Sequence, residues 1–463
     1  MGKVTVTFLG ATATVTGSRF LVESDRSKIL IDAGLFQGVK EERKRNWEPF
    51  PVEPSTIDAI LLTHAHLDHC GYLPLLVRQG FKNQIFATEY TIKLAMVVLR
   101  DSGRLQMEDA EFAAKKGFSK HSPPLPLYDL DDVEKTQSHF TEVNFRHKVE
   151  LTQDASVTYF PAGHILGSAF LLLEIDGKSL LFTGDMGRSN HPLLASPDSP
   201  PKSALSAVVT ESTYGNRVHE TPVGNFAEEI NAALKRGGSI LIPAFAVDRT
   251  EVILMALREL ISKKSIPNIP IYVDSPMALT ALDFYRDAVK RNAPELRAGV
   301  AEHWKSEDPF NPGNLNEMRT KEQSKSLNGL KERSIIISAS GMATGGRVVH
   351  HLANMLPDPR NTVILVGFQA AGSRGRSLEE GKKEIKMFGK WVPVSAHITK
   401  VENFSVHADS DELLSWLREI SQTEEAFIVH GESDAQEYLA ERLRTELGWK
   451  VIVPKTAQVY EVG

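Results

Sequence analysis

Four side chains that commonly bind metal ions lie within one run of six residues. They are His64, His66, Asp68 and His69 in the run HAHLDH. The run follows residues 57–62, an apolar segment that predicts a buried strand. Because alternate side chains of an extended segment face the same way, His64 and His66 can bind one metal ion together. A turn after the strand can direct Asp68 and His69 to a neighbouring ion, and imidazole nitrogens and carboxylate oxygens are common zinc ligands.

Two residues further along the chain are candidate ligands of the same site. His164 lies in PAGHILGS between two predicted strands, and Asp185 lies in LLFTGDMG at the end of a third. An aspartate in such a position can also be only a turn residue. The histidine run favours the ligand role, because one metal ion needs about four donors and a pair needs more.

Three later segments carry side chains that can transfer protons or bind metal. Glu211 lies in TESTYGNR, His407 in FSVHADSDEL, and His430 in AFIVHGES after an apolar strand. Taken singly, each histidine is better explained as a core or surface residue. Glu211 lies before, and the two histidines after, a segment with a different pattern of secondary structure. These positions favour a shared role.

That segment alternates predicted strands and helices. The strands are residues 239–243, 270–273, 334–338 and 362–366, and the helices are residues 248–261, 278–289 and 346–356. This alternation predicts a parallel sheet with helices on its faces. The first third of the chain is instead rich in predicted strands, one of which, residues 28–31, ends at Asp32. The simplest architecture is one domain interrupted by a second.

Asp32, the HxHxDH run, His164 and Asp185, in this order, resemble the metallo-β-lactamase superfamily. The resemblance implies an α/β fold, a four-layer αββα sandwich. It also implies one metal ion on His64, His66 and His164, a second on Asp68 and His69, and Asp185 as the bridge between them. Asp32 would orient a ligand histidine.

The segments with Glu211, His407 and His430 resemble the motifs of the β-CASP nucleases, a branch of that superfamily with an inserted domain. They are similar to the group that contains the pre-mRNA 3′-end cleavage endonuclease subunit and its bacterial and archaeal relatives. The resemblance implies that residues 1–212 and 395–463 form the metallo-β-lactamase domain. Residues 213–394 would form the β-CASP insert, with a mainly parallel sheet flanked by helices. A histidine at position 430, where the DNA-processing branch typically has valine, favours RNA.

The expected activity is hydrolysis of RNA phosphodiester bonds, as an endonuclease, a 5′-exonuclease or both, with two Zn²⁺ per chain. Two metal ions can supply a nucleophile from water and neutralise charge at phosphorus. We expect His407, oriented by Glu211, to protonate the leaving 3′-oxygen, so that the ends are 3′-hydroxyl and 5′-phosphate. His430 would bind the second ion. The predicted catalytic residues are thus His407, Glu211, Asp68 and Asp32.

Two glycine-rich segments, residues 338–347 and 366–376, follow predicted strands of the insert. Backbone N–H groups in such loops suit phosphate, so we expect phosphate contacts from Ser340, Gly341, Ser373, Arg374 and Arg376. Ordinary strand-to-helix turns are the alternative. Lys382 and Lys383 are predicted to be a solvated run of charge.

The composition of the chain limits where the protein is expected to act and how it can bind nucleic acid. The formal net charge of −6 argues against a generally basic surface, so nucleic-acid binding should be confined to one cleft. Cys70 is the only cysteine, the first residues lack the layout of a secretory signal, and no apolar run reaches the ~20 residues of a membrane helix. We expect a cytoplasmic protein that acts on single-stranded RNA. The sequence leaves a homodimer open.

Two other functions remain as alternatives at this point. One is a small-molecule ester or thioester hydrolase of the same superfamily, and the other is an inactive, metal-stabilised RNA-binding subunit. A large insert flanked by Glu211, His407 and His430 is not needed by the first. The complete ligand set argues against the second.

Overall fold

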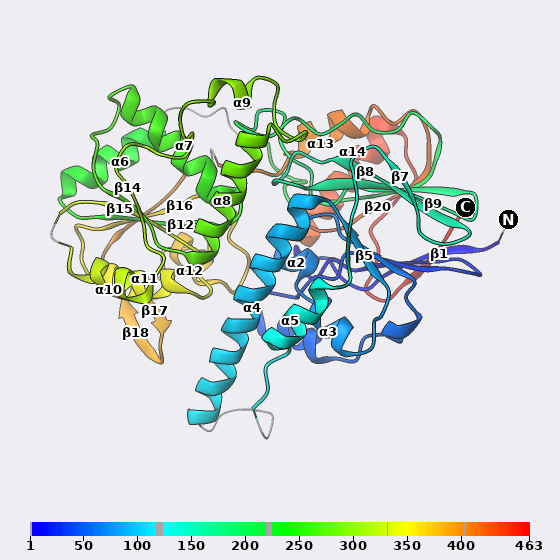
Figure 1. The fold of residues 1–463 in the computed structure, drawn as a ribbon, viewed down its shortest axis with the longest axis horizontal. Helices are drawn as coiled ribbons and strands as arrows, with labels where there is room; N and C mark the ends of the chain where they lie inside the picture. Colours follow the sequence, from blue (N-terminus) through cyan, green and yellow to red (C-terminus); the bar gives the residue numbers. More distant parts are fainter. Residues whose placement is uncertain (1, 117–123, 219–224, 331, 402–403) are drawn as a thin grey trace. The chain divides into compact units, whose positions relative to one another are not determined.

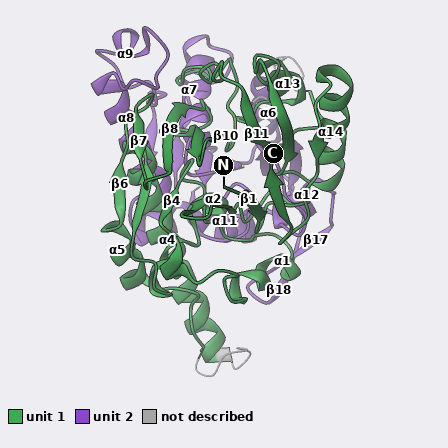
Figure 2. Ribbon diagram, turned by 90° about the vertical axis from the view of Figure 1, so that its right-hand side faces the viewer, with its two compact units in different colours: residues 1–218, 406–463 green, residues 219–405 purple. Residues whose placement is uncertain are grey.

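The computed structural model describes residues 2–116, 124–218, 225–330, 332–401 and 404–463. The chain divides into two compact units, residues 1–218 with 406–463 (unit 1) and residues 219–405 (unit 2), which Figure 2 colours separately. The assignment of residues 213–394 to an inserted domain stays a prediction. Each unit is described by itself.

Unit 1 is built on two mixed sheets of seven strands each. The first has the order β22 (Val459–Val462), β1 (Val4–Phe8), β2 (Phe20–Glu23), β3 (Lys28–Ile31), β4 (Ala59–Leu61), β5 (Gln84–Ala87), β6 (Phe140–Glu142). The second has the order β21 (Val451–Ile452), β20 (Thr423–Ile428), β11 (Leu205–Thr210), β10 (Lys178–Phe182), β9 (Ala169–Ile175), β8 (Ala155–Pro161), β7 (Lys148–Glu150).

The two sheets share one apolar core. Side chains alternate along each strand, and the inward ones, such as Phe8, Val22, Leu171 and Phe182, form a single buried cluster contributed by both sheets. Large aromatic rings close this core, with the rings of Phe8 and Phe427 5.0 Å apart. The sheets therefore pack face to face as the two inner layers of a sandwich.

Helices cover the outer faces. On the second sheet, α13 (Ser410–Leu417) and α14 (Ser433–Leu447) bury apolar side chains such as Trp416 and Leu439 against the strands. The helices associated with the first sheet are α2 (Leu67–Cys70), α3 (Leu73–Arg78), α4 (Glu89–Lys116) and α5 (Leu130–Gln137) (Figure 1). Unit 1 also holds a short helix α1 (Lys40–Lys44). The predicted αββα sandwich is confirmed.

Strand direction brings several loops to the same edge. In the second sheet β10, β11 and β20 are mutually parallel, and β8 runs in the same direction because it is antiparallel to β9, as β10 is. In the first sheet β3 and β4 are parallel. The carboxyl ends of parallel strands lie at one edge of a sheet, where sites commonly form. The predicted ligands all follow such ends.

Unit 2 contains a six-stranded sheet in which every pair is parallel. Its order is β14 (Leu315–Glu317), β13 (Ile271–Val273), β15 (Ile335–Ser338), β12 (Ile240–Pro243), β16 (Thr362–Leu365), β19 (His397–Lys400). The helices are α6 (Asn225–Arg236), α7 (Arg249–Ser262), α8 (Pro276–Arg291), α9 (Val300–His303), α10 (Lys321–Ser326), α11 (Arg347–Met355) and α12 (Arg374–Glu379). They lie on both sides of the sheet (Figure 1), so the predicted parallel sheet flanked by helices is confirmed.

A separate two-stranded hairpin, β17 (Glu384–Met387) and β18 (Lys390–Pro393), completes unit 2. This hairpin was not among the elements predicted from the sequence. Among the described residues, no helix has the length and apolar character needed to cross a membrane.

Candidate metal centre and active site

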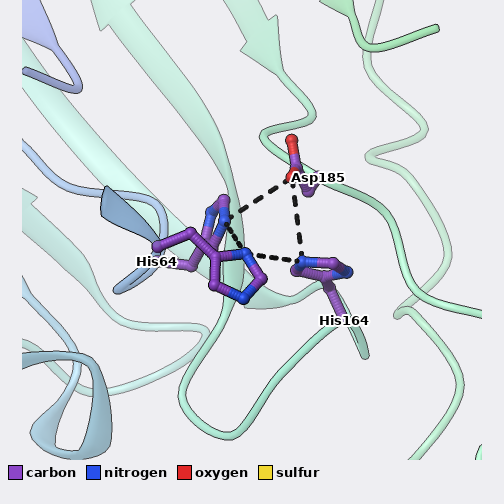
Figure 3. A group of neighbouring side chains, drawn as sticks. His64, His164 and Asp185 are labelled. Atoms are coloured by element: carbon purple, nitrogen blue, oxygen red, sulfur yellow. Dashed lines mark hydrogen bonds and ion pairs between the residues drawn. The ribbon is translucent and has the colours of Figure 1, made fainter. Parts of the chain in front are cut away.

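Three imidazoles from two loops of unit 1 converge on one point. His64 and His66 follow β4, which ends at Leu61, and His164 lies between β8 and β9. His66 Nδ1 lies 3.1 Å from His64 Nε2 and 3.2 Å from His164 Nε2. His64 and His164 are completely buried, and Figure 3 shows their rings facing Asp185. These three residues form the first ligand group.

A second group lies beside the first. Asp68 and His69 belong to the short helix α2, and His430 follows β20. His430 Nε2 is 3.2 Å from His69 Nε2 and 3.3 Å from Asp68 Oδ2. The predicted turn after β4 is therefore real, and it brings Asp68 and His69 beside His430.

Asp185 lies between the two groups and faces each with a different oxygen. Its Oδ2 is 3.6 Å from His64 Nε2 and 3.7 Å from His164 Nε2. Its Oδ1 is 3.3 Å from His69 Nε2 and 3.5 Å from His430 Nδ1. One carboxylate thus faces both groups, which is the arrangement that a ligand shared by two ions requires.

Close backbone contacts hold the loops together. Gly34 follows β3, and a Cβ atom at this position would lie 1.6 Å from the carbonyl oxygen of Asp68. The neighbouring Ala33 N–H donates to the carbonyl of His69 at 2.7 Å. Only glycine allows the loop after β3 to approach the loop after β4 this closely. Asp32 has a left-handed φ of 57°, an uncommon conformation for a residue with a side chain.

Asp32 and Thr63 fix two of the ligand rings. Asp32 Oδ2 lies 2.8 Å from His69 Nδ1 and accepts a hydrogen bond from the Thr63 hydroxyl at 2.9 Å. Thr63 Oγ1 in turn lies 3.1 Å from His64 Nδ1. Since the hydroxyl hydrogen points to Asp32, its oxygen is left to accept from His64. Both rings then direct Nε2 into the cluster.

Thr213 fixes the ring of His430 in a similar way. Its hydroxyl oxygen lies 3.1 Å from His430 Nδ1, and the hydroxyl is within 3.3 Å of the His430 carbonyl, to which it can donate. Sequence reasoning missed both Thr63 and Thr213. The available signal was position, since Thr63 precedes the histidine run and Thr213 lies two residues after Glu211.

Burial controls the protonation of the first group. It lowers the pKa values of His64 and His164 well below the ordinary value, and the imidazoles of His69 and His407 respectively lower them further. Burial also lowers the pKa of His66 to about 4. All three rings are neutral at neutral pH, as metal binding requires.

In the second group, neighbouring charges outweigh burial in setting the pKa values. Burial opposes a charged His69, but Asp185 and Asp32 outweigh it and raise the pKa of that imidazole well above its ordinary value. Burial likewise opposes a charged Asp185, yet His430 and His69 hold the pKa of its carboxyl well below the usual range. Protons on these imidazoles balance the buried carboxylate, and a bound metal ion would replace them.

The spacing of the donors fits a metal ion. Tetrahedral nitrogen ligands at 2.0–2.1 Å from zinc lie about 3.3 Å apart, close to the 3.1 and 3.2 Å separations around His66. Among the described residues, the buried Asp185 Oδ1 has no hydrogen bond of normal geometry and faces the imidazole nitrogens of His69 and His430. Imidazoles and carboxylates without a thiolate suit zinc and other divalent transition metals. The cluster is therefore a metal-binding site.

His407 and Glu211 lie at the more open side of the cluster. His407 Nδ1 is 3.4 Å from Glu211 Oε2 and 3.8 Å from Asp185 Oδ2. The Glu211 carboxylate is itself fixed, because it accepts hydrogen bonds from the N–H groups of Met186 at 2.5 Å and Thr213 at 3.3 Å. The side chain of His407 is 16% exposed, against 2% for Asp185 and Glu211. Glu211 therefore orients the His407 ring through Nδ1.

The predicted phosphate-binding residues lie in unit 2, where the two glycine-rich loops contact each other. Gly375 N–H donates to the Met342 carbonyl at 3.1 Å. Arg374 donates to the carbonyls of Ala343 and Thr344 at 3.2 and 2.9 Å, so it also links the loops. The loops follow β15 and β16, at the carboxyl-end edge of the parallel sheet.

Three more of the predicted phosphate contacts, Ser340, Ser373 and Arg376, also have partners inside unit 2. Ser340 Oγ accepts from Thr344 N–H at 3.0 Å, and Ser373 Oγ accepts from Arg376 N–H at 3.1 Å at the start of α12. Arg376 donates to Glu380 Oε1 at 2.9 Å. The structure thus brings Ser340, Gly341, Ser373, Arg374 and Arg376 into one loop cluster.

Comparison with known proteins agrees with this geometry. Family models match three stretches: the metallo-beta-lactamase superfamily over residues 15–218, the Beta-Casp domain over residues 250–378, and the Zn-dependent metallo-hydrolase RNA specificity domain over residues 391–454. A crystal structure of a protein of unknown function from Enterococcus faecalis V583 superposes with a TM-score of 0.53 at 14% identity, covering 99% of this chain and 100% of that one. This likeness concerns the fold alone.

Several relatives are similar over nearly the whole chain. Ribonuclease TTHA0252 of Thermus thermophilus is 35% identical over 428 residues, which cover 92% of each chain. An RNase J-like protein of Methanocaldococcus jannaschii is 31% identical and covers 89% of this chain and 88% of its own. Transcription termination factor FttA of Methanosarcina mazei is 32% identical and covers 93% and 67%. With its two-sheet sandwich, its inserted parallel sheet and its paired ligand groups, the chain belongs to the β-CASP family of the metallo-β-lactamase superfamily.

Proposed function

We propose that this chain is a metal-dependent ribonuclease that hydrolyses phosphodiester bonds of single-stranded RNA. The observation on which this depends most is that Asp185 lies between two ligand groups while His407, beside Glu211, flanks them. A charged phosphodiester needs more than one positive centre and a proton donor, and this arrangement offers both. The ribonuclease names of two similar proteins support RNA as the substrate and do not favour a small-molecule ester.

The ligand roles follow from the distances. One ion would be held by His64, His66 and His164, and a second by Asp68, His69 and His430, with Asp185 shared. We propose two Zn²⁺, since the donors are imidazoles and carboxylates. Bound metal ions would supply the nucleophile from water and neutralise charge on the phosphoryl oxygens.

The chain's own residues would manage the proton. His407 would deliver a proton to the leaving 3′-oxygen, while Glu211 accepts the hydrogen bond of Nδ1 and orients the ring. Glu211 would act through His407 and not on the substrate. The expected products carry 3′-hydroxyl and 5′-phosphate ends.

Unit 2 would supply contacts to substrate phosphates. We propose Ser340, Gly341, Ser373, Arg374 and Arg376 for this role, since their loops lie at one edge of a parallel sheet. We also propose residues 213–394 as the β-CASP insert. The single, buried Cys70 supports a cytoplasmic location, where disulfides are rare.

Metal removal tests the proposed function. Purified protein should cleave a labelled single-stranded RNA, lose this activity after treatment with a chelator, and regain it when Zn²⁺ is added back. An RNA of the same sequence paired with its complement is the control for single-strand preference. A protein that holds its metal and cleaves no RNA would refute the proposal.

Thr213→Val should weaken the binding of the second metal ion. The substitution keeps the shape of the side chain but removes the oxygen that accepts from His430 Nδ1. Removing such a supporting contact typically lowers metal affinity 10- to 100-fold. Competitive titration against a chromophoric chelator measures the change, and Thr213→Ser should restore the affinity. If the valine variant held both ions as tightly as the wild type, Thr213 would not position His430.

A further inference from the structure

The β17–β18 hairpin of unit 2 presents an aromatic and basic face to solvent. In its register Lys386 pairs with Trp391, and Ile385 pairs with Val392. Because side chains alternate along a strand, the first pair faces outward and the second faces the core. Ile385 is buried and Val392 packs beside the same apolar cluster. The hairpin is thus held on one side and free to bind on the other.

Two large rings on this hairpin are more exposed than folding alone requires. The side chain of Trp391 is 61% exposed and that of Phe388 is 56% exposed. One side of the Phe388 ring stacks on His350, with centroids 4.5 Å apart and planes at 27°. Exposed aromatic rings grouped in one place commonly mark a binding surface.

The backbone conformation at the tip of the hairpin also indicates that Phe388 has a role other than forming the turn. Phe388 and Gly389 form a two-residue turn in which both φ angles are positive, 51° and 79°. Such turns strongly favour Asn-Gly, and a bulky residue with positive φ is rare. Turn stability would therefore favour asparagine at position 388, so the phenyl ring has to be explained by something other than the turn.

The same segment concentrates positive charge on an acidic protein. Residues 382–394 hold four lysines and one glutamate, although the whole chain has a formal net charge of −6. Lys382, Lys383, Lys386 and Lys390 are exposed, and among the residues that the structure describes none of them forms an ion pair. Uncompensated ammonium groups beside exposed rings fit a ligand that combines negative charge with flat aromatic groups.

The hairpin is joined directly to the loop cluster of unit 2. Arg374 Nε donates to the Lys386 carbonyl at 3.2 Å, while the same guanidinium binds the carbonyls of Ala343 and Thr344 in the first glycine-rich loop. One side chain thus connects the proposed phosphate-binding loops to the hairpin. An RNA strand that contacts these loops can continue onto the hairpin.

We propose that the exposed surface of the hairpin and of the residues that lead into it, formed by Phe388, Trp391 and the four lysines, binds single-stranded RNA outside the active site. Bases stack on the two rings and phosphates pair with the lysines, the combination used by many single-strand-binding surfaces. This proposal rests on the proposed function, because it takes the substrate as the ligand. It also replaces the interpretation of Lys382 and Lys383 as a merely solvated run of charge.

Binding of a long RNA tests the proposal. Dissociation constants are measured by fluorescence anisotropy with a labelled 30-nucleotide single strand at fixed salt, in a His407→Ala background to prevent cleavage. Phe388→Asn combined with Trp391→Thr should raise Kd roughly tenfold. Lys386→Glu with Lys390→Glu should weaken binding and lower the salt dependence by at least about 0.7 per lysine.

Controls separate binding from folding and from net charge. Asparagine suits the positive φ of position 388, so Phe388→Asn should unfold at a temperature no lower than that of the wild type. Lys202→Glu with Lys305→Glu changes the net charge equally at exposed sites elsewhere and should leave Kd unchanged.

The other possible outcomes distinguish a failure of the hairpin proposal from a failure of the proposed function. If the hairpin variants bind the RNA as tightly as their background, the hairpin proposal is wrong even when the wild type cleaves RNA. If they change a dimer into a monomer in sedimentation without changing Kd, the face joins copies of the chain and the proposal is again wrong. A wild type that cleaves no RNA would instead refute the proposed function.

Discussion

Asp185→Asn is expected to remove RNA cleavage by roughly 10³-fold or more and to lower the metal content of the protein. Asp185 faces both ligand groups, with one oxygen 3.3 Å from His69 and the other 3.6 Å from His64. An amide of the same shape offers one neutral oxygen, so it cannot supply a charged donor to both ions. A single substitution should therefore disturb both ions together.

Elemental analysis of the purified variant measures this directly, alongside cleavage of a labelled RNA. Asp198→Asn is a suitable control, because Asp198 is an aspartate of the same unit that pairs with Arg146 at the surface. The control should keep the metal content and the rate of the wild type. An Asp185→Asn protein with two tightly bound ions and normal cleavage would show that Asp185 is not the shared ligand.

His407→Ala is expected to keep both metal ions and to lose roughly 10²- to 10⁴-fold in the rate of cleavage, the usual contribution of a positioned acid. His407 belongs to neither ligand group and lies 3.4 Å from Glu211. Its loss should therefore remove a proton donor and leave the metal site intact. Metal analysis and single-turnover rates measure the two effects separately.

A substrate with sulfur in place of the leaving 3′-oxygen isolates the role of the proton. A thiol has a pKa of about 8.5 and leaves as the thiolate without protonation. The defect of His407→Ala should shrink strongly on this substrate, whereas the defect of Asp185→Asn should not. An equal defect of His407→Ala on both substrates would mean that His407 does not protonate the leaving group.

Much of the fold was predictable because its signals are local. The strand of residues 28–31 was predicted with its observed bounds, and the four strands and three helices predicted in unit 2 differ from the observed ones by a few residues at their ends. Several of the strands that were missed are short, and β6, β7 and β14 have three residues each. Their pairing is set by partners far away in the chain, which a short window of sequence does not contain.

The candidate site divides in the same way. Residue types and spacing identified His64 to His69, because several donors in one short run are rare without a metal. Sequence could not show that each oxygen of Asp185 faces a different group, since this depends on the relative placement of two sheets. Nor could it distinguish Thr63 and Thr213 from other threonines, because their role lies in one hydrogen bond each.

The hairpin shows a further limit of sequence reasoning. Lys382 and Lys383 resemble an ordinary charged run when they are read alone. Only the register, which places Lys386 opposite Trp391, and the exposure of Phe388 show a coherent face. Exposure of a ring is a property of the fold and not of its sequence neighbours.

The most direct test of the central claim is end-group analysis of RNA cleaved by the purified, zinc-loaded protein. The proposed mechanism, in which water is the nucleophile and His407 protonates the 3′-oxygen, predicts that every new end is a 5′-phosphate or a 3′-hydroxyl. Products that end in 2′,3′-cyclic phosphate and 5′-hydroxyl would contradict the account, because they would mean that the neighbouring 2′-hydroxyl was the nucleophile.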